Sequence, residues 1–244
     1  NADRFTLAGG RTRVEAFRPR GGRYLQIAVR NATAPVTIHR VDVRRTLCPV
    51  RVEGRFECSD PVFNWTWSTG LHTLLTLMED TWNADAWRER GLYLGDTYVI
   101  HNATTAFWRE PSFIRQTLRL WAHGQYPDGQ IRDCVPAWLN RPLIDYTLIW
   151  ILLLCDYVLQ SADLPLLREL WPHVERLFAS PVWHEGPHGL WTGDTGSVFI
   201  DWTTTQEMRT GENGVLNAFR YAALLCAAEL AGLLKDKAAA ARCT

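Results

Sequence analysis

The chain has 244 residues, of which 47% are hydrophobic, and its 26 Lys and Arg residues balance 26 Asp and Glu residues. A chain of this length can bury a substantial core in one or two domains. The charge balance argues against a polyanion partner, so no nucleic-acid binding is expected. The most apolar run, Ile149 to Cys155, is bracketed too tightly by Asp145 and Asp156 to span a membrane.

Six cysteines are present, none of them in a C-x-x-C pair, and seven histidines show no metal-ligand spacing. In a chain this long, that cysteine pattern is not a disulfide framework. We therefore expect no metal site and no cofactor. A reduced, cytoplasmic setting is the simplest interpretation, and secretion is the alternative if a leader has been removed.

Residues 1–57 are predicted to be β-rich. Leu25–Arg30 and Val36–Val43 largely alternate apolar with polar residues, and glycine pairs punctuate them. Because two or three strands alone make a weak core, the segment is interpreted as the end of a β-sandwich or as a linker sheet. A carbohydrate-binding module is the functional alternative, and a scaffold role is favoured.

From residue 58 the periodicity becomes helical. Ser59-Asp60-Pro61 is a good helix start, with Val62 and Trp65 expected in an inward-facing stripe. The predicted helix at about Ile144–Gln160 is apolar almost all round, which suits an inner helix of a two-layer helical barrel. The further predicted helices are about Asp96–Trp108, Pro111–Gly124, Ile144–Gln160, a helix capped by Asp163 that Pro172 is expected to break or bend, and Asn213–Leu234.

The stretch Asp80–Asp96 combines carboxylates, aromatic residues and glycines, and is predicted to be a loop leading into a helix. Sugars offer hydroxyl edges to carboxylates and arginine, and apolar faces to aromatic rings. Glu89, flanked by Trp87 and Tyr93, is the candidate acid, because a poorly solvated carboxylic acid keeps its proton near neutral pH. The competing interpretation is that Arg88-Glu89-Arg90 is a solvated charge cluster.

Trp87-Arg88-Glu89, followed by Tyr93-Leu94-Gly95-Asp96, resembles the D-C-P-W-R-E-x-x-x-Y-L-G-D signature of the α-L-rhamnosidases of glycoside hydrolase family 78. The likeness extends over nearly the whole chain. Further motifs follow in the family's order: Arg55–Pro61, Gln125–Gly129, Ile144–Trp150, Asp201-Trp202 and Gly211–Asn217.

The resemblance implies a mainly α fold in which residues 58–244 are the first half of an (α/α)6 barrel, about six of twelve helices. It implies inverting hydrolysis of terminal α-L-rhamnose from a rhamnose-containing glycoside, with Glu89 as the catalytic acid. The substrate-binding residues that it implies are Asp85, Trp87, Arg88, Tyr93, Asp96, Asp145, Tyr146, Asp201 and Trp202. For Asp201 and Trp202 the alternative is a capping carboxylate beside a core indole.

Two departures from the family pattern matter. Ala84 stands where the family has its first sugar-binding Asp, so that carboxylate is absent or displaced to Asp85. The family's general base comes from a downstream Trp-Glu motif that this sequence lacks. Within the chain Glu207 and Glu212 are the candidates, although Glu212 precedes a helix and is expected to be structural.

Six helices would leave an apolar inner surface open, so we expect the remaining half-barrel, or a second chain, to cover it. The 244 residues alone are then expected to be an inactive fragment. Two other hypotheses stay open: a catalytically degenerate rhamnose-binding protein, favoured by Ala84, and a helical scaffold module whose tryptophans are simply core.

Overall fold

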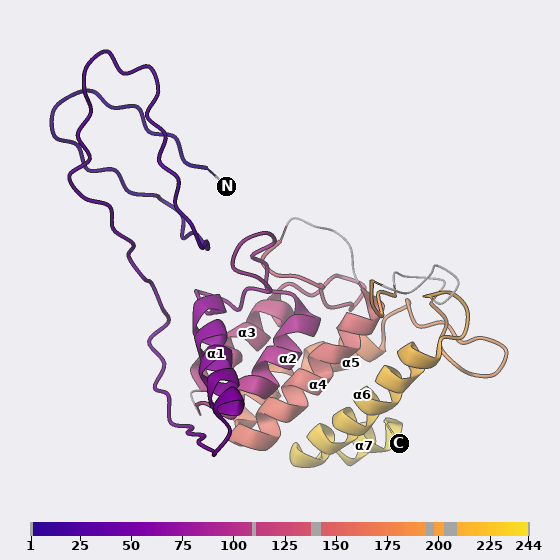
Figure 1. The fold of residues 1–244 in the computed structure, drawn as a ribbon. Coiled ribbons are helices and arrows are strands. Elements are labelled where there is room, and N and C mark those ends of the chain that lie inside the picture. Colours follow the sequence, from indigo (N-terminus) through magenta and orange to yellow (C-terminus); the bar gives the residue numbers. More distant parts are fainter. Residues whose placement is uncertain (1, 109–110, 138–142, 194–197, 203–208, 244) are drawn as a thin grey trace.

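The computed structural model describes residues 2–108, 111–137, 143–193, 198–202 and 209–243, and within them the chain is mainly helical, as predicted. Figure 1 shows the helices in one block, with the amino-terminal segment extending away from it. The helices are α1 (Pro61–Leu77), α2 (Leu94–Thr104), α3 (Pro111–His123), α4 (Ile144–Ser161), α5 (Leu164–Phe178), α6 (Gly214–Leu233) and the short α7 (Lys237–Arg242).

Three helix starts follow from capping side chains, and the sequence identified the caps of the first two. Oδ1 of Asp60 accepts the backbone N–H of Val62 at 2.8 Å at the start of α1. Asp163 caps α5 through Leu166, and Asn213 caps α6 through Leu216, at 3.0 and 2.9 Å. Each cap satisfies a backbone donor that has no partner within its helix, so the chain enters each helix at a defined residue.

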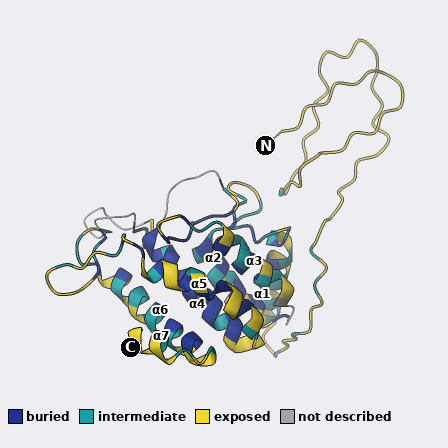
Figure 2. Cartoon of the chain, turned by 180° about the vertical axis from the view of Figure 1, so that it is seen from behind, coloured by how far each residue is buried: buried dark blue, intermediate teal, exposed yellow. Residues whose placement is uncertain are grey.

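Helix α4 is the centre of the core, as its apolar sequence predicted. Nearly all of its residues are buried, and it contacts α2, α3, α5 and α6. Figure 2 shows it as the most continuously buried helix of the block. By length and composition α4 and α6 could each cross a membrane, but 72% of the apolar window of α4 is buried inside the protein. That burial is typical of a core helix.

Pro172 lies inside α5 without breaking it, so the break expected there is not found. Proline removes one backbone donor, and here the carbonyl left without it belongs to the exposed Arg168, where water can replace the lost bond. The opposite side of α5 is buried through the predicted stripe, which is Leu167, Leu170, Val174 and Leu177. Packing of that stripe outweighs the local effect of the proline.

The predicted strands are not formed in the amino-terminal segment, which we define as residues 2–57. This segment carries no strand, and its alternating apolar residues stay in solvent, with Leu25 at 67% and Ile27 at 51% exposed. Figure 1 shows it as a pair of extended loops that return to the start of α1. Alternation specifies a strand only where a sheet can bury the apolar face, and the described residues offer no such sheet.

The inward stripe predicted for α1 is also wrong at its start. Val62 and Trp65 are 62% and 67% exposed, whereas Leu74 near the carboxyl end is buried. Trp67, on another side of the helix, packs against Phe107 with ring centroids 4.3 Å apart. The side of α1 that carries Val62 and Trp65 therefore faces solvent, and α1 joins the core through Trp67 and through its last turns.

Long and short connections alternate along the helices, and this alternation creates the site. The turns after α2 and α4 are short, whereas the connections after α1, α3 and α5 run over residues 78–93, 124–143 and 179–213. Figure 1 places the described parts of these three long connections at the same end of the helical block. Polar residues from distant parts of the sequence therefore meet on one loop face.

Candidate active site

The connection between α1 and α2 carries Glu89, and we call residues 79–93 the Glu89 loop. The backbone N–H of Ala84 donates to the carbonyl of Gly91 at 2.8 Å, which closes the base of the loop. Both oxygens of Asp85 accept backbone N–H groups from the turn above, at 2.7 Å from Trp87, 2.5 Å from Arg88 and 3.0 Å from Glu89. Asp85 thus fixes the backbone on which the candidate acid stands.

That arrangement gives Asp85 a structural role in the loop. Partial burial raises its pKa, but the three backbone donors and the nearby Arg88 outweigh burial and hold the pKa below its usual range. Both of its oxygens accept hydrogen bonds from the chain itself, and its role as the replacement for the sugar-binding carboxylate at Ala84 stays a prediction. It is a positioning residue of the turn.

Glu89 itself lies at the surface of the loop face. Its side chain is 37% exposed, and Oε1 accepts a hydrogen bond from Nη2 of Arg88 at 3.0 Å. The neighbouring Trp87 is 65% exposed. The poorly solvated, aromatic-walled surroundings expected for Glu89 are therefore not formed in this structure, and an arginine partner stands there instead.

Asp96 lies in the first turn of α2 and faces the same region as Glu89. Its pKa is raised, first by burial and then by the charges of Glu89 and Asp85, although a backbone N–H partly opposes the increase. The residue as a whole is nonetheless exposed, so its carboxylate is accessible from solvent. Glu89 and Asp96 thus lie close enough for their charges to interact, as the sequence predicted.

A second segment supports the end of the Glu89 loop. Leu94 N–H donates to the carbonyl of Asp133 at 2.9 Å, Val135 N–H donates to that of Leu92 at 3.2 Å, and Tyr93 pairs with Cys134 in an antiparallel bridge. Burial, reinforced by the nearby carboxylates, raises the pKa of the Cys134 thiol to about 11.

Asp133 is completely buried beside this pairing. The sequence did not single out Asp133 or Cys134.

Tyr146, in the first turn of α4, joins the Glu89 loop side of the site to the connection after α5. Its pKa is raised, first by burial and then by the carboxylates of Asp96, Asp145, Asp133 and Asp201. Its ring meets Phe199 edge to face at 5.8 Å. The structure therefore brings Tyr146 and Asp96 together, as expected for two residues of one pocket.

Asp145 is buried, with 1% of its surface exposed, and does not reach the loop face. Its two oxygens accept the backbone N–H groups of Phe199 and Ile200, at 3.1 and 3.0 Å. Ile200 has a φ of +57°, a left-handed conformation that is unfavourable for a β-branched residue. In this structure Asp145 holds a strained turn in place, and its contact with the sugar stays a prediction.

That turn presents Asp201 and Trp202. The Trp202 indole is 77% exposed and contacts Phe199 edge to face at 5.0 Å, so the alternative of a core tryptophan is excluded. The Trp202 N–H donates to Oδ1 of Asp201 at 2.6 Å, and Arg209 donates to the Asp201 carbonyl at 2.6 Å. Phe199, which the sequence did not highlight, links Trp202 to Tyr146.

Glu212 is structural, as predicted. Its carboxylate accepts the backbone N–H groups of His188 and Leu190 and pairs with the His188 ring. The His188 hydrogen bond, which is the largest influence, lowers the pKa of Glu212 despite some desolvation. Glu207, the other candidate base, lies outside the described residues. Within the described ranges no group of three or more metal-ligating side chains is assembled.

Paired helices around an inner helix, with acidic and aromatic side chains on the loops of one end, define the class of six-hairpin glycosidases. The chain belongs to the family of the bacterial α-L-rhamnosidase six-hairpin glycosidase domain, whose model matches residues 51–243. No match was found among curated proteins.

Solved structures agree with this family assignment. A GH78 rhamnosidase from Bacillus sp. GL1 is 25% identical, with a TM-score of 0.72 over 80% of this chain and 21% of that one. A Klebsiella oxytoca rhamnosidase with rhamnose bound is 24% identical, with a TM-score of 0.61 over 76% of this chain and 38% of that one. An Aspergillus terreus α-L-rhamnosidase is 16% identical, with a TM-score of 0.67 over 80% of this chain and 24% of that one. The chain thus spans between about a fifth and two fifths of their lengths.

Proposed function

We propose that this chain carries the acid-catalyst side of an inverting α-L-rhamnosidase site, with Glu89 as the general acid. The observation that carries the proposal is the meeting of Glu89, Asp96 and Tyr146 on one loop face, at the positions of the family motif. Family membership supports a glycosidase, and the rhamnose-bound relative supports rhamnose as the sugar.

In the proposed reaction Glu89 donates a proton to the glycosidic oxygen as the bond from that oxygen to the anomeric carbon breaks. A water molecule attacks the anomeric carbon from the opposite face, and a second carboxylate removes its proton, so the configuration inverts. Inverting enzymes hold the two carboxyl groups roughly 6.5 to 9.5 Å apart to admit that water. We propose that the second carboxylate is supplied from outside residues 1–244, so that these residues alone show little turnover.

Binding of the sugar is assigned to the exposed groups around Glu89. Asp96 accepts rhamnose hydroxyl groups, and Arg88 either holds a hydroxyl or tunes Glu89 through their contact. The exposed indoles of Trp87 and Trp202 offer flat apolar surfaces to the sugar ring. Tyr93, Tyr146 and Asp201 complete the site.

One observation favours a second candidate function, a rhamnose-binding protein without catalysis. Ala84 removes a family carboxylate, and the oxygens of Asp85 already accept hydrogen bonds from the backbone. Loss of one hydrogen-bond partner for a sugar hydroxyl costs about 1 to 3 kcal/mol of binding. A site weakened in this way could retain binding while losing the orientation that hydrolysis needs.

The test compares the full-length protein, which includes the second carboxylate, with its Glu89→Gln variant on an aryl α-L-rhamnoside, and it follows both aryl release and rhamnose binding. The proposal predicts hydrolysis by the protein, loss of hydrolysis in the variant, and binding retained in both. Unchanged turnover in Glu89→Gln would refute the assignment. Binding without any hydrolysis in the parent protein would support the second function.

A further inference from the structure

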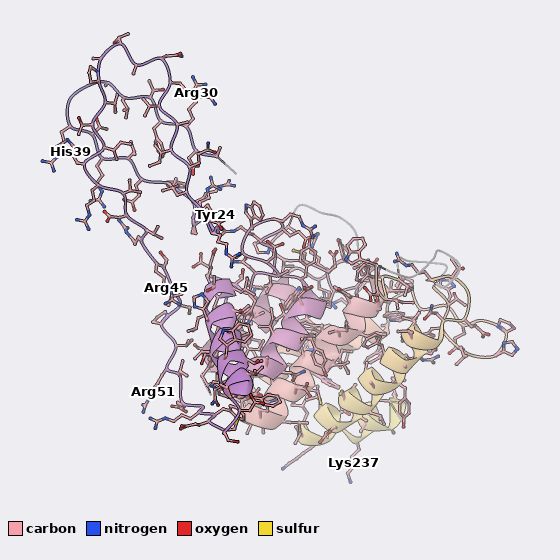
Figure 3. The ribbon with its side chains drawn as sticks, in the orientation of Figure 1. Tyr24, Arg30, His39, Arg45, Arg51 and Lys237 are labelled. Atoms are coloured by element: carbon pink, nitrogen blue, oxygen red, sulfur yellow. The ribbon has the colours of Figure 1, made fainter. Side chains whose placement is uncertain are left out.

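The amino-terminal segment touches the Glu89 loop at one defined place. Every residue from 2 to 47 is exposed except Gly21, which is half-buried against Ala86. Two residues earlier, the carbonyl of Pro19 accepts a hydrogen bond from Nη1 of Arg90 at 2.6 Å. In Figure 3 the labelled Tyr24 lies close to the loop end of the helical block, whereas Arg30 and His39 lie far from it.

Arg90 holds this contact and a second one at the same time. Its Nη2 donates to both carboxylate oxygens of Glu79, at 2.5 and 2.6 Å, at the other end of the loop. We call Arg90, with Glu79 and the Pro19 carbonyl, the Arg90 clamp. Arg90 and Glu79 are 25% and 34% exposed, so the pair is partly shielded from water. A planar guanidinium suits such simultaneous contacts, and a lysine ammonium does not reproduce them.

The backbone at Arg90 needs such support. Its φ is +48°, in the left-handed region that residues with a Cβ rarely adopt. The conformation reverses the chain directly after Glu89 and returns it to Gly91, whose carbonyl closes the loop on Ala84. Such conformations persist only where the surroundings over-determine them. The clamp supplies that constraint one residue from the proposed acid.

The amino-terminal segment also contacts the turn that precedes Glu89, which Asp85 holds. Asp85 fixes the amides of Trp87, Arg88 and Glu89, and Ala86, next to Asp85, is the residue on which Gly21 packs. The docking end of the segment is itself braced, because Arg20 pairs with Asp3 through two hydrogen bonds of 3.1 and 2.6 Å. Glu89 is thus held from both sides, by the turn at Asp85 and by the clamp at Arg90.

We propose that Arg90 is a positioning residue for Glu89 and that residues 19–21 of the amino-terminal segment act with it as a brace on the Glu89 loop. The catalytic part of this inference rests on the proposed function, whereas the structural part stands independently of it. Arg90 touches no substrate in this account. Its effect reaches the reaction only through the placement of the Glu89 carboxyl.

Adjacent glycines provide a matched pair of variants. A Cβ added at Gly21 would lie 2.8 Å from the Ala86 carbonyl oxygen, so Gly21→Ala must push the segment off the loop. A Cβ at Gly22 would meet only the Tyr24 carbonyl oxygen at 3.8 Å, an ordinary contact. For Arg90→Ala the matched control is Arg119→Ala, which breaks a similar two-bond pair with Glu169 between α3 and α5.

The first measurement is amide hydrogen exchange of the peptide covering residues 84–92. We expect faster exchange at Trp87, Arg88 and Glu89 in Gly21→Ala and Arg90→Ala than in Gly22→Ala and Arg119→Ala. The exchange rate in Arg90→Lys, which keeps one contact at most, should lie between those of Arg90→Ala and the parent protein. Exchange in both test variants that matches their controls would overturn the inference, whatever the protein's activity.

The second measurement is steady-state hydrolysis of an aryl α-L-rhamnoside by the full-length protein, which includes the second carboxylate, and by its variants with the same substitutions. Misplacing a catalytic group by about 1 Å can lower turnover about a hundredfold, so kcat should fall by about tenfold to a hundredfold in Arg90→Ala. KM should change little, because Asp96 is carried by α2. Faster exchange with unchanged kcat would overturn the positioning role. Absence of hydrolysis by the full-length parent protein would refute the proposed function, and the hydrogen-exchange measurement alone would then decide whether residues 19–21 brace the Glu89 loop.

Discussion

Tyr146 lies directly on the backbone of Gly95, the residue before Asp96. A Cβ built at Gly95 would come within 2.7 Å of the Tyr146 ring carbon Cζ and 2.8 Å of its hydroxyl oxygen. The first turn of α2, which carries Asp96, can therefore approach the start of α4 only because residue 95 has no side chain. This contact joins the Glu89 loop side of the site to the side formed by Phe199 and Trp202.

We expect Gly95→Ala to have opposite effects on stability in two backgrounds. With Tyr146 present, the overpacked methyl group should lower the free energy of unfolding by about 1 to 3 kcal/mol. With Tyr146→Ala already made, the space is open, and alanine in a helix should stabilise by up to about 1 kcal/mol. Urea unfolding of the four proteins of this double-mutant cycle measures the coupling. Equal effects of Gly95→Ala in both backgrounds would show that the two residues do not meet.

Asp145→Asn separates a structural role from a sugar contact. The amide replaces one acceptor oxygen with a donor that faces the backbone N–H of Phe199 or Ile200, so we expect a loss of about 1 to 3 kcal/mol in stability. Thermal unfolding measures this loss, and Asp201→Asn is the control, because Asp201 is exposed. An Asp145→Asn protein that is as stable as the parent but binds rhamnose more weakly would restore the direct contact that the sequence predicted.

His101 should make the fold sensitive to acid. Burial lowers its pKa from 6.5 to about 4, because the buried ring resists becoming charged. Between those two values the unfolded chain binds the proton and the folded chain does not, so stability is complete above pH 6.5 and falls as the pH decreases toward 4. The loss at pH 4.5 should be about 2 to 3 kcal/mol, since one pKa unit corresponds to about 1.4 kcal/mol.

The check is urea unfolding at pH 7.5 and 4.5 for the parent protein, His101→Gln and His39→Gln. Glutamine does not titrate, so His101→Gln should lose less stability between the two pH values than the parent does. His39 is exposed on the amino-terminal segment, and its replacement should leave the pH dependence as it was. An identical pH dependence in all three proteins would contradict the burial of a neutral His101.

The helices could be predicted from the sequence because their signals are local. The caps Asp60, Asp163 and Asn213 act on amides two or three residues away, and the apolar α4 has few alternatives to the core. The strands predicted before residue 58 are not formed, because their stability does not depend on local signals alone. Their alternation is a local pattern whose stability depends on a distant partner sheet.

The site was predictable as a set of residues and much less as a set of roles. The motif placed Glu89 and Asp96 together, but the engagement of Asp85 and Asp145 with backbone amides depends on how turns close in space. Contacts such as Arg90 with Pro19, 71 residues apart, and Cys134 with Tyr93 leave no periodic or spacing signal in one sequence. They arise because three long connections meet at one end of the helices.

The most direct test of the account is the dependence of Glu89→Gln on the leaving group. An aryl rhamnoside whose phenol is strongly acidic leaves without a proton, whereas one with a weakly acidic phenol needs the general acid. We predict that kcat/KM of Glu89→Gln falls steeply as the phenol becomes less acidic, while that of the parent protein varies little. Equal losses for all leaving groups, or no loss for any, would contradict the assignment of Glu89 as the proton donor.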